Sequence, residues 1–229
     1  MKNLTLIIPA KNESESLPIV LKDLQELDCE IMISLKEDDL NTINAIKKYN
    51  VKTHYQTKKG YGNSLVEAIE KCETELFCIF NADGSFEKKD LDQMVKLCEV
   101  NDFVFTTRYH KNAGSEDDTI ITYIGNQLFS LIGRLFFSLK INDILYTFVM
   151  GNVEKFRKLK VKSDDFRFCV EFPIKMQISN FSYISIPSHE KKRLKGEKKV
   201  NAFKDGFLIL IEMIRLFIYF KLFRNKIIK

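Results

Sequence analysis

The sequence predicts an α/β protein with a mostly parallel sheet and helices on both faces. Through its first 107 residues, short apolar runs alternate with segments whose apolar residues recur at helical spacing, and a polar loop follows each run. Strands and helices that alternate at these lengths are typical of parallel sheets, because each crossover helix covers one face. Ligands of such sheets bind beyond the carboxyl ends of the strands. We therefore expect the polar loops to converge on one site.

The first unit sets the pattern that the other elements repeat. Leu4 to Ile8 is an apolar run ended by Pro9, and Asn12 and Glu15 have the N-cap and N3 spacing of a capping box. Ile120 to Leu139 is a long amphipathic segment. The remaining predicted strands are Glu30 to Leu35, Val51 to Gln56, Leu76 to Phe80, Phe103 to Thr107 and Tyr183 to Ile186, and the predicted helices include Thr42 to Tyr49, Ser64 to Cys72 and Lys89 to Cys98.

Composition limits the class of protein. The 229 residues are 45% hydrophobic and 29% charged, which is ordinary for a globular domain and argues against a disordered chain or a polytopic membrane protein. The five cysteines show no CxxC spacing, and no apolar signal segment precedes Pro9. These features predict reduced cysteines in a cytoplasmic protein.

The positive charge is concentrated at the carboxyl end. The net charge is +5, but Ile186 to Lys229 holds 12 Lys and Arg against 4 Asp and Glu. A basic terminal block indicates a phosphate-rich partner, such as an anionic membrane surface or a phospholipid headgroup. A nucleic-acid partner is not expected, because the basic residues are confined to one end and no recognised binding module occurs.

The last segment predicts an amphipathic helix. Phe207 to Phe223 is strongly apolar but is interrupted by Glu212, Arg215 and Lys221. A membrane-spanning helix needs ~20 apolar residues in succession, so a helix that lies in the membrane surface fits better. The alternative is a helix docked on the protein core or in a dimer interface. We therefore divide the chain into a main domain, 1–203, and a basic amphipathic helix, 204–229.

The loop after the fourth predicted strand predicts a metal site. Asn81 and Asp83 stand one residue apart, and Gly84 and Ser85 follow. Carboxylate, amide and hydroxyl oxygens suit Mg²⁺ or Mn²⁺ held against phosphates. Asp83 is the expected carboxylate ligand, with Asn81 and Ser85 as weaker ligands, and Asn81 is expected to lower the metal affinity because it brings no charge. The alternative is an Asx turn after a strand.

Six motifs stand in a recognisable order along the chain. They are Ile7-Ile8-Pro9-Ala10-Lys11-Asn12-Glu13, Lys59-Gly60-Tyr61-Gly62-Asn63-Ser64-Leu65, Asn81-Ala82-Asp83-Gly84-Ser85, Thr107-Arg108-Tyr109, Asp143 with Gly151, and Arg193-Leu194-Lys195-Gly196-Glu197-Lys198-Lys199. In this order the chain resembles the family-2 glycosyltransferases of the GT-A fold, particularly the branch similar to dolichyl-phosphate mannose synthase and the bacterial polyprenyl-phosphate sugar transferases.

The resemblance implies a Rossmann-like GT-A domain that uses a nucleotide-sugar donor and a divalent cation. Pro9 also fixes the first loop, and Gly60 and Gly62 let the backbone approach a ligand closely. Lys59 is available to a phosphate at the following helix amino terminus. The nucleotide contacts that follow from the resemblance are Pro9, Ala10, Asn12, Glu13, Glu37, Lys59, Gly60, Asn81 and Ala82.

The reaction implied is direct displacement with inversion at the anomeric carbon. A lipid phosphate is already anionic at neutral pH, whereas a hydroxyl acceptor needs a carboxylate as general base. Asp143 and Glu171 are the candidates, Glu171 in a stretch similar to the Phe-x-x-Glu of the family; each has an ordinary structural acid as its alternative. Arg108 is assigned to catalysis, and Arg193 and Lys199 to the acceptor or donor phosphates, because guanidinium and ammonium groups neutralise such anions.

The leading hypothesis is an inverting glycosyltransferase, peripheral at the inner face of the membrane, with polyprenyl phosphate as its acceptor. Within the enzyme class, the alternatives are transfer to a saccharide acceptor in glycan synthesis and a sugar-nucleotide nucleotidyltransferase. The nonenzymatic alternative is a degenerate transferase that binds without turnover, which Asn81 motivates. A homo-oligomer is a further expectation that the sequence leaves open.

Overall fold

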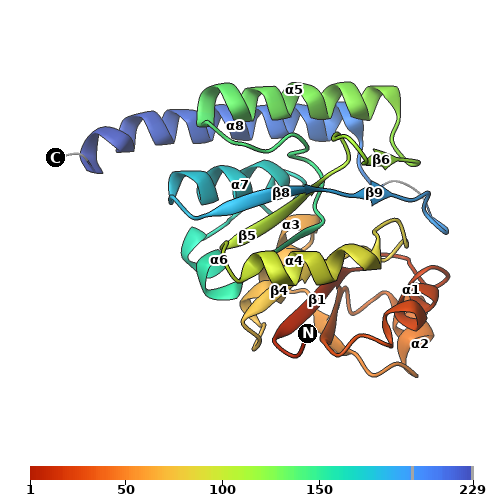
Figure 1. Ribbon diagram of the computed structural model, residues 1–229. Helices are drawn as coiled ribbons and strands as arrows, with labels where there is room; N and C mark the ends of the chain where they lie inside the picture. Colours follow the sequence, from red (N-terminus) through yellow and green to blue (C-terminus); the bar gives the residue numbers. More distant parts are fainter. Residues whose placement is uncertain (197–198, 228–229) are drawn as a thin grey trace.

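A seven-stranded sheet organises the chain (Figure 1). The computed structural model describes residues 1–196 and 199–227, with side chains through residue 221. The strand order is β3-β2-β1-β4-β7-β5-β8, in which β7 alone is antiparallel to its neighbours. The strand order turns back between β1 and β4, so their carboxyl ends form the crevice where ligands bind in such sheets. The strands are β1 (Leu4–Pro9), β2 (Glu30–Leu35), β3 (Lys52–Tyr55), β4 (Leu76–Ile79), β5 (Phe103–Thr107), β7 (Val149–Asn152) and β8 (Tyr183–Pro187).

Helices cover both faces of the sheet, as predicted. One face packs on α1 (Leu17–Leu24), α2 (Leu40–Ile46) and α4 (Leu91–Cys98), the last preceded by the short η1 (Lys88–Asp90). The other face packs on α3 (Tyr61–Glu70), α6 (Val153–Leu159) and α7 (Phe168–Ile178). Two long helices, α5 (Ile120–Phe137) and α8 (Ala202–Ile227), lie together over α7 as an outer layer (Figure 1). A small second sheet pairs β6 (Gly114–Ser115) with β9 (His189–Glu190).

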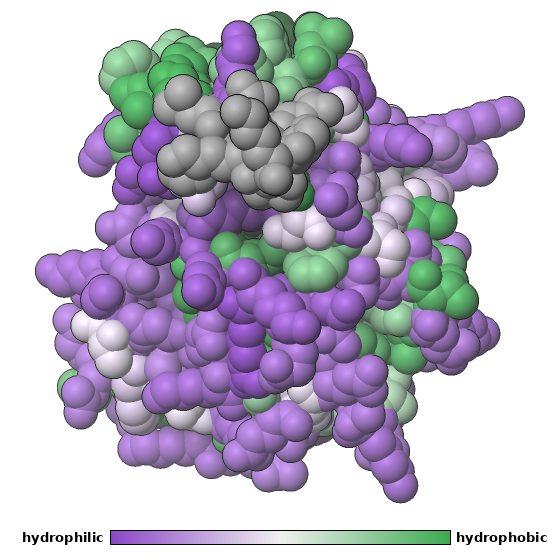
Figure 2. Space-filling view, turned by 90° about the vertical axis from the view of Figure 1, so that its left-hand side faces the viewer, coloured by the Kyte–Doolittle hydropathy of each residue, from purple (hydrophilic) through white to green (hydrophobic). Residues whose placement is uncertain are grey.

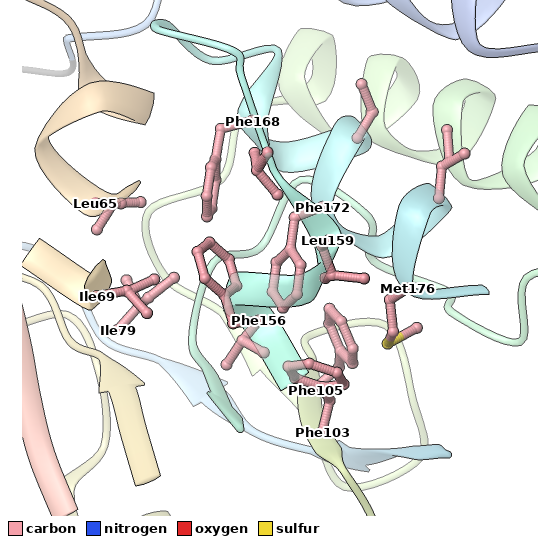
Figure 3. Close-up of a cluster of buried hydrophobic side chains, with 14 of the residues drawn as sticks. Leu65, Ile69, Ile79, Phe103, Phe105, Phe156, Leu159, Phe168, Phe172 and Met176 are labelled. Carbon is pink, nitrogen blue, oxygen red and sulfur yellow. The ribbon is translucent and has the colours of Figure 1, made fainter. Parts of the chain in front are cut away.

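Alternation along the central strands places apolar side chains on both faces. Val104 faces the α1/α4 side, whereas Phe103 and Phe105 face the α6/α7 side. There Phe172 of α7 and Phe156 of α6 form an aromatic cluster with them (Figure 3); the Phe103 and Phe172 ring centroids are 5.3 Å apart. Each fully buried Phe contributes about 1.5–3 kcal/mol through burial alone. The sheet is therefore a rigid platform for the loops at its edge.

The predicted capping box at Asn12 and Glu15 is wrong. The first helix begins at Leu17, with Ser16 as its N-cap residue. A helix capped by Asn12 would carry Pro18 in its interior, where proline lacks the donor N–H and clashes with the preceding turn. Asn12 instead adopts a left-handed conformation with φ 55°.

Several elements were not predicted from the sequence. β7 and α6 follow one another directly, and β7 inserts between β4 and β5.

The predicted carboxyl-terminal helix exists and begins at Ala202; it packs on the main domain through the buried side chains of Ile209, Met213 and Leu216. Its opposite face is exposed, so docking on the core occupies only one side of this helix.

Candidate active site

A cleft of 1280 Å³ opens at the carboxyl edge of the sheet. The loops after β1, β2, β3 and β4 converge there, as the parallel-sheet prediction requires. Three of the predicted site residues, Glu37, Asp143 and Glu171, are not among those that line it. The predicted residues that do line the cleft are Pro9, Ala10, Asn12, Glu13, Lys59, Gly60, Asn81, Ala82, Asp83, Ser85, Arg108, Arg193 and Lys199.

Asn81, Asp83 and Ser85 form a closed, hydrogen-bonded turn. The Asp83 Oδ1 accepts the Ser85 backbone N–H at 3.0 Å, and the Asn81 Oδ1 accepts the Phe86 backbone N–H at 3.3 Å. The Asn81 side-chain amide donates to the Ser85 hydroxyl. Gly84 has a φ of +79°, which a glycine adopts without strain. The Asx turn and the metal hypothesis are thus compatible, because Asp83 Oδ2 takes no part in the turn.

A basic segment lies directly on this turn. The backbone N–H of Leu194 donates to the Asp83 carbonyl at 2.8 Å. Arg193 bridges two carboxylates: its Nη1 is 3.4 Å from Asp83 Oδ2, and its Nη2 is 2.7 Å from Asp117 Oδ2. Arg193 therefore neutralises the same carboxylate oxygen that a bound cation would use. The neighbouring Glu197 and Lys198 of the predicted motif lie outside the described residues.

The donor set at Asp83 fits a hard cation with few protein ligands. Within residues 1–196 and 199–227, no three His, Cys, Asp or Glu side chains are grouped closely enough to hold a metal ion. Asp83 Oδ2 faces the cleft from the end of β4, with the Ser85 hydroxyl in the same turn. Mg²⁺ usually takes one or two carboxylates and completes its shell with water and phosphate oxygens. Such an ion fits here only together with a phosphate-bearing ligand.

Arg108 is fixed in place on every side. Its Nε and Nη2 donate to the Asp143 carboxylate at 2.8 and 2.9 Å, and its Nη1 donates to Glu190 at 2.9 Å. The guanidinium carbon lies 4.5 Å from the Tyr146 ring centroid, a cation–π distance. Burial lowers the pKa of Arg108, but the hydrogen bonds and charges of Asp143 and Glu190 raise it overall. Arg108 is thus a rigid cation on the cleft wall.

Asp143 lies behind Arg108, not in the cleft. Its side chain is fully buried, and both carboxylate oxygens accept from Arg108. The side-chain amide of Asn126 donates to the same carboxylate. With its oxygens occupied and no access to the cleft, Asp143 has the geometry of a residue that positions Arg108. The general-base role that the sequence suggested for Asp143 does not fit this placement.

Glu171 is also absent from the residues that line the cleft. Its buried carboxylate accepts the backbone N–H groups of Lys162, at 3.0 Å, and Ser163, at 2.6 Å, and it pairs with Lys175 at 2.6 Å. Burial raises the pKa of Glu171, but the hydrogen bonds from Lys175 and Ser163 outweigh it and lower the pKa overall. Glu171 therefore anchors the loop around Ser163, and a general-base role does not fit it.

Gly60, the N-cap residue of α3, and Gly62, in its first turn, pack against that same loop. A Cβ atom on Gly60 would lie 1.9 Å from the Asp164 carbonyl oxygen, and one on Gly62 would lie 2.2 Å from that of Ser163. The Asp164 carbonyl also accepts the backbone N–H of Asn63 at 3.2 Å, so it caps the helix that was expected to face a phosphate. The close approach predicted for these glycines exists, but its partner is protein backbone.

The first loop is held by the second. The Asn12 backbone N–H donates to Asp39 Oδ2 at 2.7 Å, and that of Glu13 donates to the Thr42 hydroxyl at 3.0 Å. Burial raises the pKa of Glu13 overall. Hydrogen bonding from Ser16 and the charge of Lys199, 3.7 Å away, oppose this rise only in part. These contacts fix the part of the cleft lining that the first loop contributes. In the second loop, Asp38 and Asp39 line the cleft and the exposed Glu37 does not.

Several residues that line the cleft were missed in the sequence. Asp117 and Asp118 precede α5, Glu190 lies in β9, and the Tyr146 ring stacks on Arg108. The Tyr146 hydroxyl is buried and has no hydrogen-bond partner within the described part of the chain. The adjacent acids Asp117 and Asp118 could have been recognised in the sequence as candidate site residues. Tyr146 and Glu190 belong to no local sequence pattern, and only the tertiary fold brings them to the cleft.

The fold and the cleft agree with the comparison to known families. The sequence model of Glycosyl transferase family 2 matches residues 5–160, more than half of the chain. The chain belongs to glycosyl transferase family 2. The predictions of a glycosyltransferase and of the GT-A fold are confirmed, and the nucleotidyltransferase alternative loses its support.

Two curated relatives of this family-2 protein share little sequence identity with it. An uncharacterized glycosyltransferase of Mycobacterium bovis and one of Mycobacterium tuberculosis are each 24% identical over 110 residues, 48% of this chain and 50% of theirs. The chain thus matches about half the length of these curated relatives. The family assignment therefore rests on the family model, which matches residues 5–160.

Solved structures share the fold at very low identity. Glucosyl-3-phosphoglycerate synthase from Mycobacterium tuberculosis, in complex with Mn²⁺, UDP and glucosyl-3-phosphoglycerate, superposes with a TM-score of 0.70 at 10% identity, covering 94% of this chain and 80% of that one. Mannosyl-3-phosphoglycerate synthase from Rubrobacter xylanophilus gives 0.68 at 11% identity, covering 98% and 75%. These similarities establish the architecture of the family-2 domain.

Proposed function

We propose that this family-2 enzyme transfers a sugar, with inversion, from a nucleotide-sugar donor to polyprenyl phosphate at the inner face of the membrane. The observation that carries the proposal is the charge arrangement of the cleft. In this cleft, Asp83 lies in the loop after β4 together with the cationic side chains of Arg108, Arg193 and Lys199, each of which is paired with a carboxylate. Such a cleft suits a reaction in which both the leaving group and the acceptor carry phosphate.

The donor side of the proposal rests on the first, second and fourth loops. Asn12 and Asp39 offer short polar groups to a base or ribose, and Asp83 lies where the diphosphate would follow. The structural neighbours support this assignment of a nucleotide site, since the synthase from Mycobacterium tuberculosis was solved with UDP and with Mn²⁺ or Mg²⁺. When bound, Mg²⁺ or Mn²⁺ would neutralise the diphosphate leaving group. Asp83 would hold the cation, with Asn81 and Ser85 supporting the turn.

The acceptor side rests on the cations and on the placement of the acids. An anionic phosphate oxygen attacks the anomeric carbon, the bond to the diphosphate breaks, and the nucleoside diphosphate leaves with the electron pair. No proton has to be removed from such an acceptor. The two acids predicted as bases, Asp143 and Glu171, lie outside the cleft lining, which favours a phosphate acceptor over a hydroxyl. Arg108 and Arg193 are the groups that would neutralise the charge of the acceptor.

The alternative is a hydroxyl-bearing acceptor, in which a carboxylate of the cleft acts as base. Asp118 lines the cleft and accepts hydrogen bonds from the Tyr109 and Thr122 hydroxyls, so it is the matching candidate. One of the structurally similar synthases was solved with phosphoglyceric acid, a molecule that carries both a phosphate and a hydroxyl group. Saccharides and phosphoglycerate are therefore the comparison acceptors.

A panel of nucleotide sugars tests the proposal. The release of nucleoside diphosphate is measured with Mg²⁺ or Mn²⁺ and one of four acceptors: polyprenyl phosphate in detergent, phosphoglycerate, a free saccharide, or none. Turnover that requires polyprenyl phosphate is expected. Turnover with a saccharide or phosphoglycerate alone would replace the acceptor. Release of inorganic diphosphate in a separate reaction with a nucleoside triphosphate and a sugar phosphate would indicate nucleotidyl transfer, and nucleotide binding without any turnover would favour a degenerate binding protein.

A further inference from the structure

The outer layer of the molecule presents a broad apolar surface. α5 and α8 lie side by side and run in the same direction (Figure 1): Phe129 lies beside Gly206, and further along both helices the ring of Phe136 packs on that of Phe217, 5.4 Å away. We call their solvent-facing side the α5/α8 face. It consists of exposed side chains of both helices: Ile120, Ile121, Ile124, Leu128, Leu131 and Leu135 of α5, and Phe203, Phe207, Leu210, Ile211, Ile214 and Ile218 of α8.

These residues form continuous stripes. At 100° per residue, Ile124, Leu128, Leu131 and Leu135 fall within about 60° of one another on α5, and the apolar positions of α8 cluster similarly. Leu135 is 69% exposed and Phe207 is 64% exposed. Figure 2 shows hydrophobic residues gathered along the top of the molecule, where α5 and α8 lie in Figure 1. Apolar side chains exposed in such a row mark an interaction surface.

The occupant is not a bilayer that α5 crosses. Among the described helices, only α5 is long and apolar enough to span a membrane by length and composition. Its other side, however, is built into the domain: Asn126 donates to Asp143, and the Ser130 hydroxyl accepts the Ile144 backbone N–H at 3.1 Å. Gly133 and Phe137 are buried beside them. The helix therefore lies along the surface and offers one side only, which is the geometry of interfacial adsorption.

The charges around the face select an anionic bilayer. α5 carries one basic residue, Arg134, and no acid, and α8 carries five basic residues against two acids. Glu212 is buried and bonded to Arg215, Asp205 accepts the backbone N–H of Asn201, and the formal net charge of α8, five basic residues less two acids, is +3. Basic side chains flanking an apolar stripe favour anionic headgroups. A second copy on this face would bring the same basic residues together, which like-charge repulsion disfavours.

The same two helices also line the cleft, through residues outside the exposed apolar face. Thr122 and Asn126 of α5 and Lys204 and Ile209 of α8 belong to both the cleft lining and these helices. We infer that the α5/α8 face adsorbs to the surface of an anionic bilayer, so that the helices that line one side of the cleft lie on the membrane surface. This inference rests on the proposed function only for the identity of the acceptor. Adsorption itself requires neither donor nor turnover.

Sedimentation with vesicles tests the inference. The full chain is mixed with vesicles of phosphatidylglycerol and phosphatidylcholine, or of phosphatidylcholine alone, at low and high salt, without donor or acceptor. We expect binding to the anionic vesicles that weakens with salt. Leu135→Glu on α5 and Phe207→Glu on α8 are each expected to weaken binding at least tenfold, because each places a charge in the apolar stripe. The matched control is Val100→Glu, since Val100 is 77% exposed outside the face and should be neutral.

The outcomes separate this inference from the proposed function. Thermal unfolding of each variant shows whether it is folded, and Ile214→Gln, which adds no charge, replaces any variant that is not. Failure of the wild type to bind anionic vesicles, or equal loss in Val100→Glu, overturns the inference. A wild-type dimer that Leu135→Glu converts to a monomer, without vesicle binding, also overturns it and assigns the face to self-association. Vesicle binding without turnover of polyprenyl phosphate leaves the face intact and removes the proposed acceptor.

Discussion

Arg108 and Asp143 form a bidentate pair in which Nε lies 2.8 Å from Oδ2 and Nη2 lies 2.9 Å from Oδ1. The Arg108 backbone N–H also donates to Oδ2, at 2.9 Å. One buried carboxylate thus fixes both the main chain and the side chain of the cation on the cleft wall. Such charge-assisted, forked bonds set direction as well as distance.

The pair predicts how Asp143→Asn behaves. An amide cannot accept the fork of Arg108, so the guanidinium loses its orientation, and kcat/KM is expected to fall on the order of 10–100-fold. Steady-state kinetics with varied acceptor and pH measure this. Because Asp143 positions Arg108 and is no general base, the shape of the pH–rate profile should be unchanged. Disappearance of one limb of the profile would restore the base role that the sequence suggested.

Asp83→Asn should abolish most of the turnover. Removing the carboxylate at the end of β4 is expected to lower kcat/KM by at least about 100-fold, because the leaving diphosphate loses the group that holds its cation. Turnover is measured against Mg²⁺ and Mn²⁺ concentration. Asp92→Asn, an exposed acid on α4, is the control. Wild-type turnover in Asp83→Asn at saturating donor and metal would end the metal role of Asp83.

Asn81→Asp should have the opposite effect and strengthen metal binding. A second carboxylate in the turn adds ligand charge, so the metal concentration for half-maximal activity is expected to fall roughly tenfold. The same titration measures it. Asn81→Ala, which removes the amide that binds Ser85 and Phe86, distinguishes lost turn geometry from altered charge. A metal requirement identical in the Asp variant and the wild type would show that position 81 does not face the cation.

Glu171→Gln should destabilise the fold in a pH-dependent way. The folded pKa of Glu171 is lowered, so its contribution is fully present above the unfolded value of about 4.3 and is lost as pH falls through the folded value. Removing one partner of a buried ion pair costs about 3–5 kcal/mol at neutral pH. Urea unfolding of wild type and variant from pH 7 to pH 3.5 should show the difference shrinking at the acidic end. The exposed Glu99→Gln serves as control, and a pH-independent difference would contradict the charge argument.

Gly60→Ala should also destabilise the protein. The new methyl group would lie 1.9 Å from the Asp164 carbonyl oxygen, at a φ of +126°, so the backbone must shift. A loss of about 2–4 kcal/mol is expected from the strain and the lost packing. Gly125→Ala is the matched change, because nothing lies within 4 Å of its added Cβ in α5, and it should stabilise by about 0.5–1 kcal/mol. Comparable unfolding free energies for the two variants would refute the close approach at Gly60.

Local pattern was sufficient for most of the sheet and for the strand-end loops. β2 and β5 begin and end at the predicted residues, and the turn at Asp83 lies at the predicted edge. The local sequence pattern was insufficient to predict β7, because its four residues include Gly151, a weak strand former. A Cβ at Gly151 would lie 2.1 Å from the Phe103 ring, so this glycine is explained by a neighbour 48 positions away in the chain.

The sequence by itself determined the family, the alternating architecture and the loops that form the cleft, because these depend on periodicity and on short motifs. Only the tertiary structure decided the roles of the buried acids. Asp143 and Glu171 look alike in the sequence, but burial and their donors assign one to Arg108 and the other to the loop around Ser163. The α5/α8 face was decided in the same way. Which side of an apolar helix remains exposed depends on the partner that buries its other side.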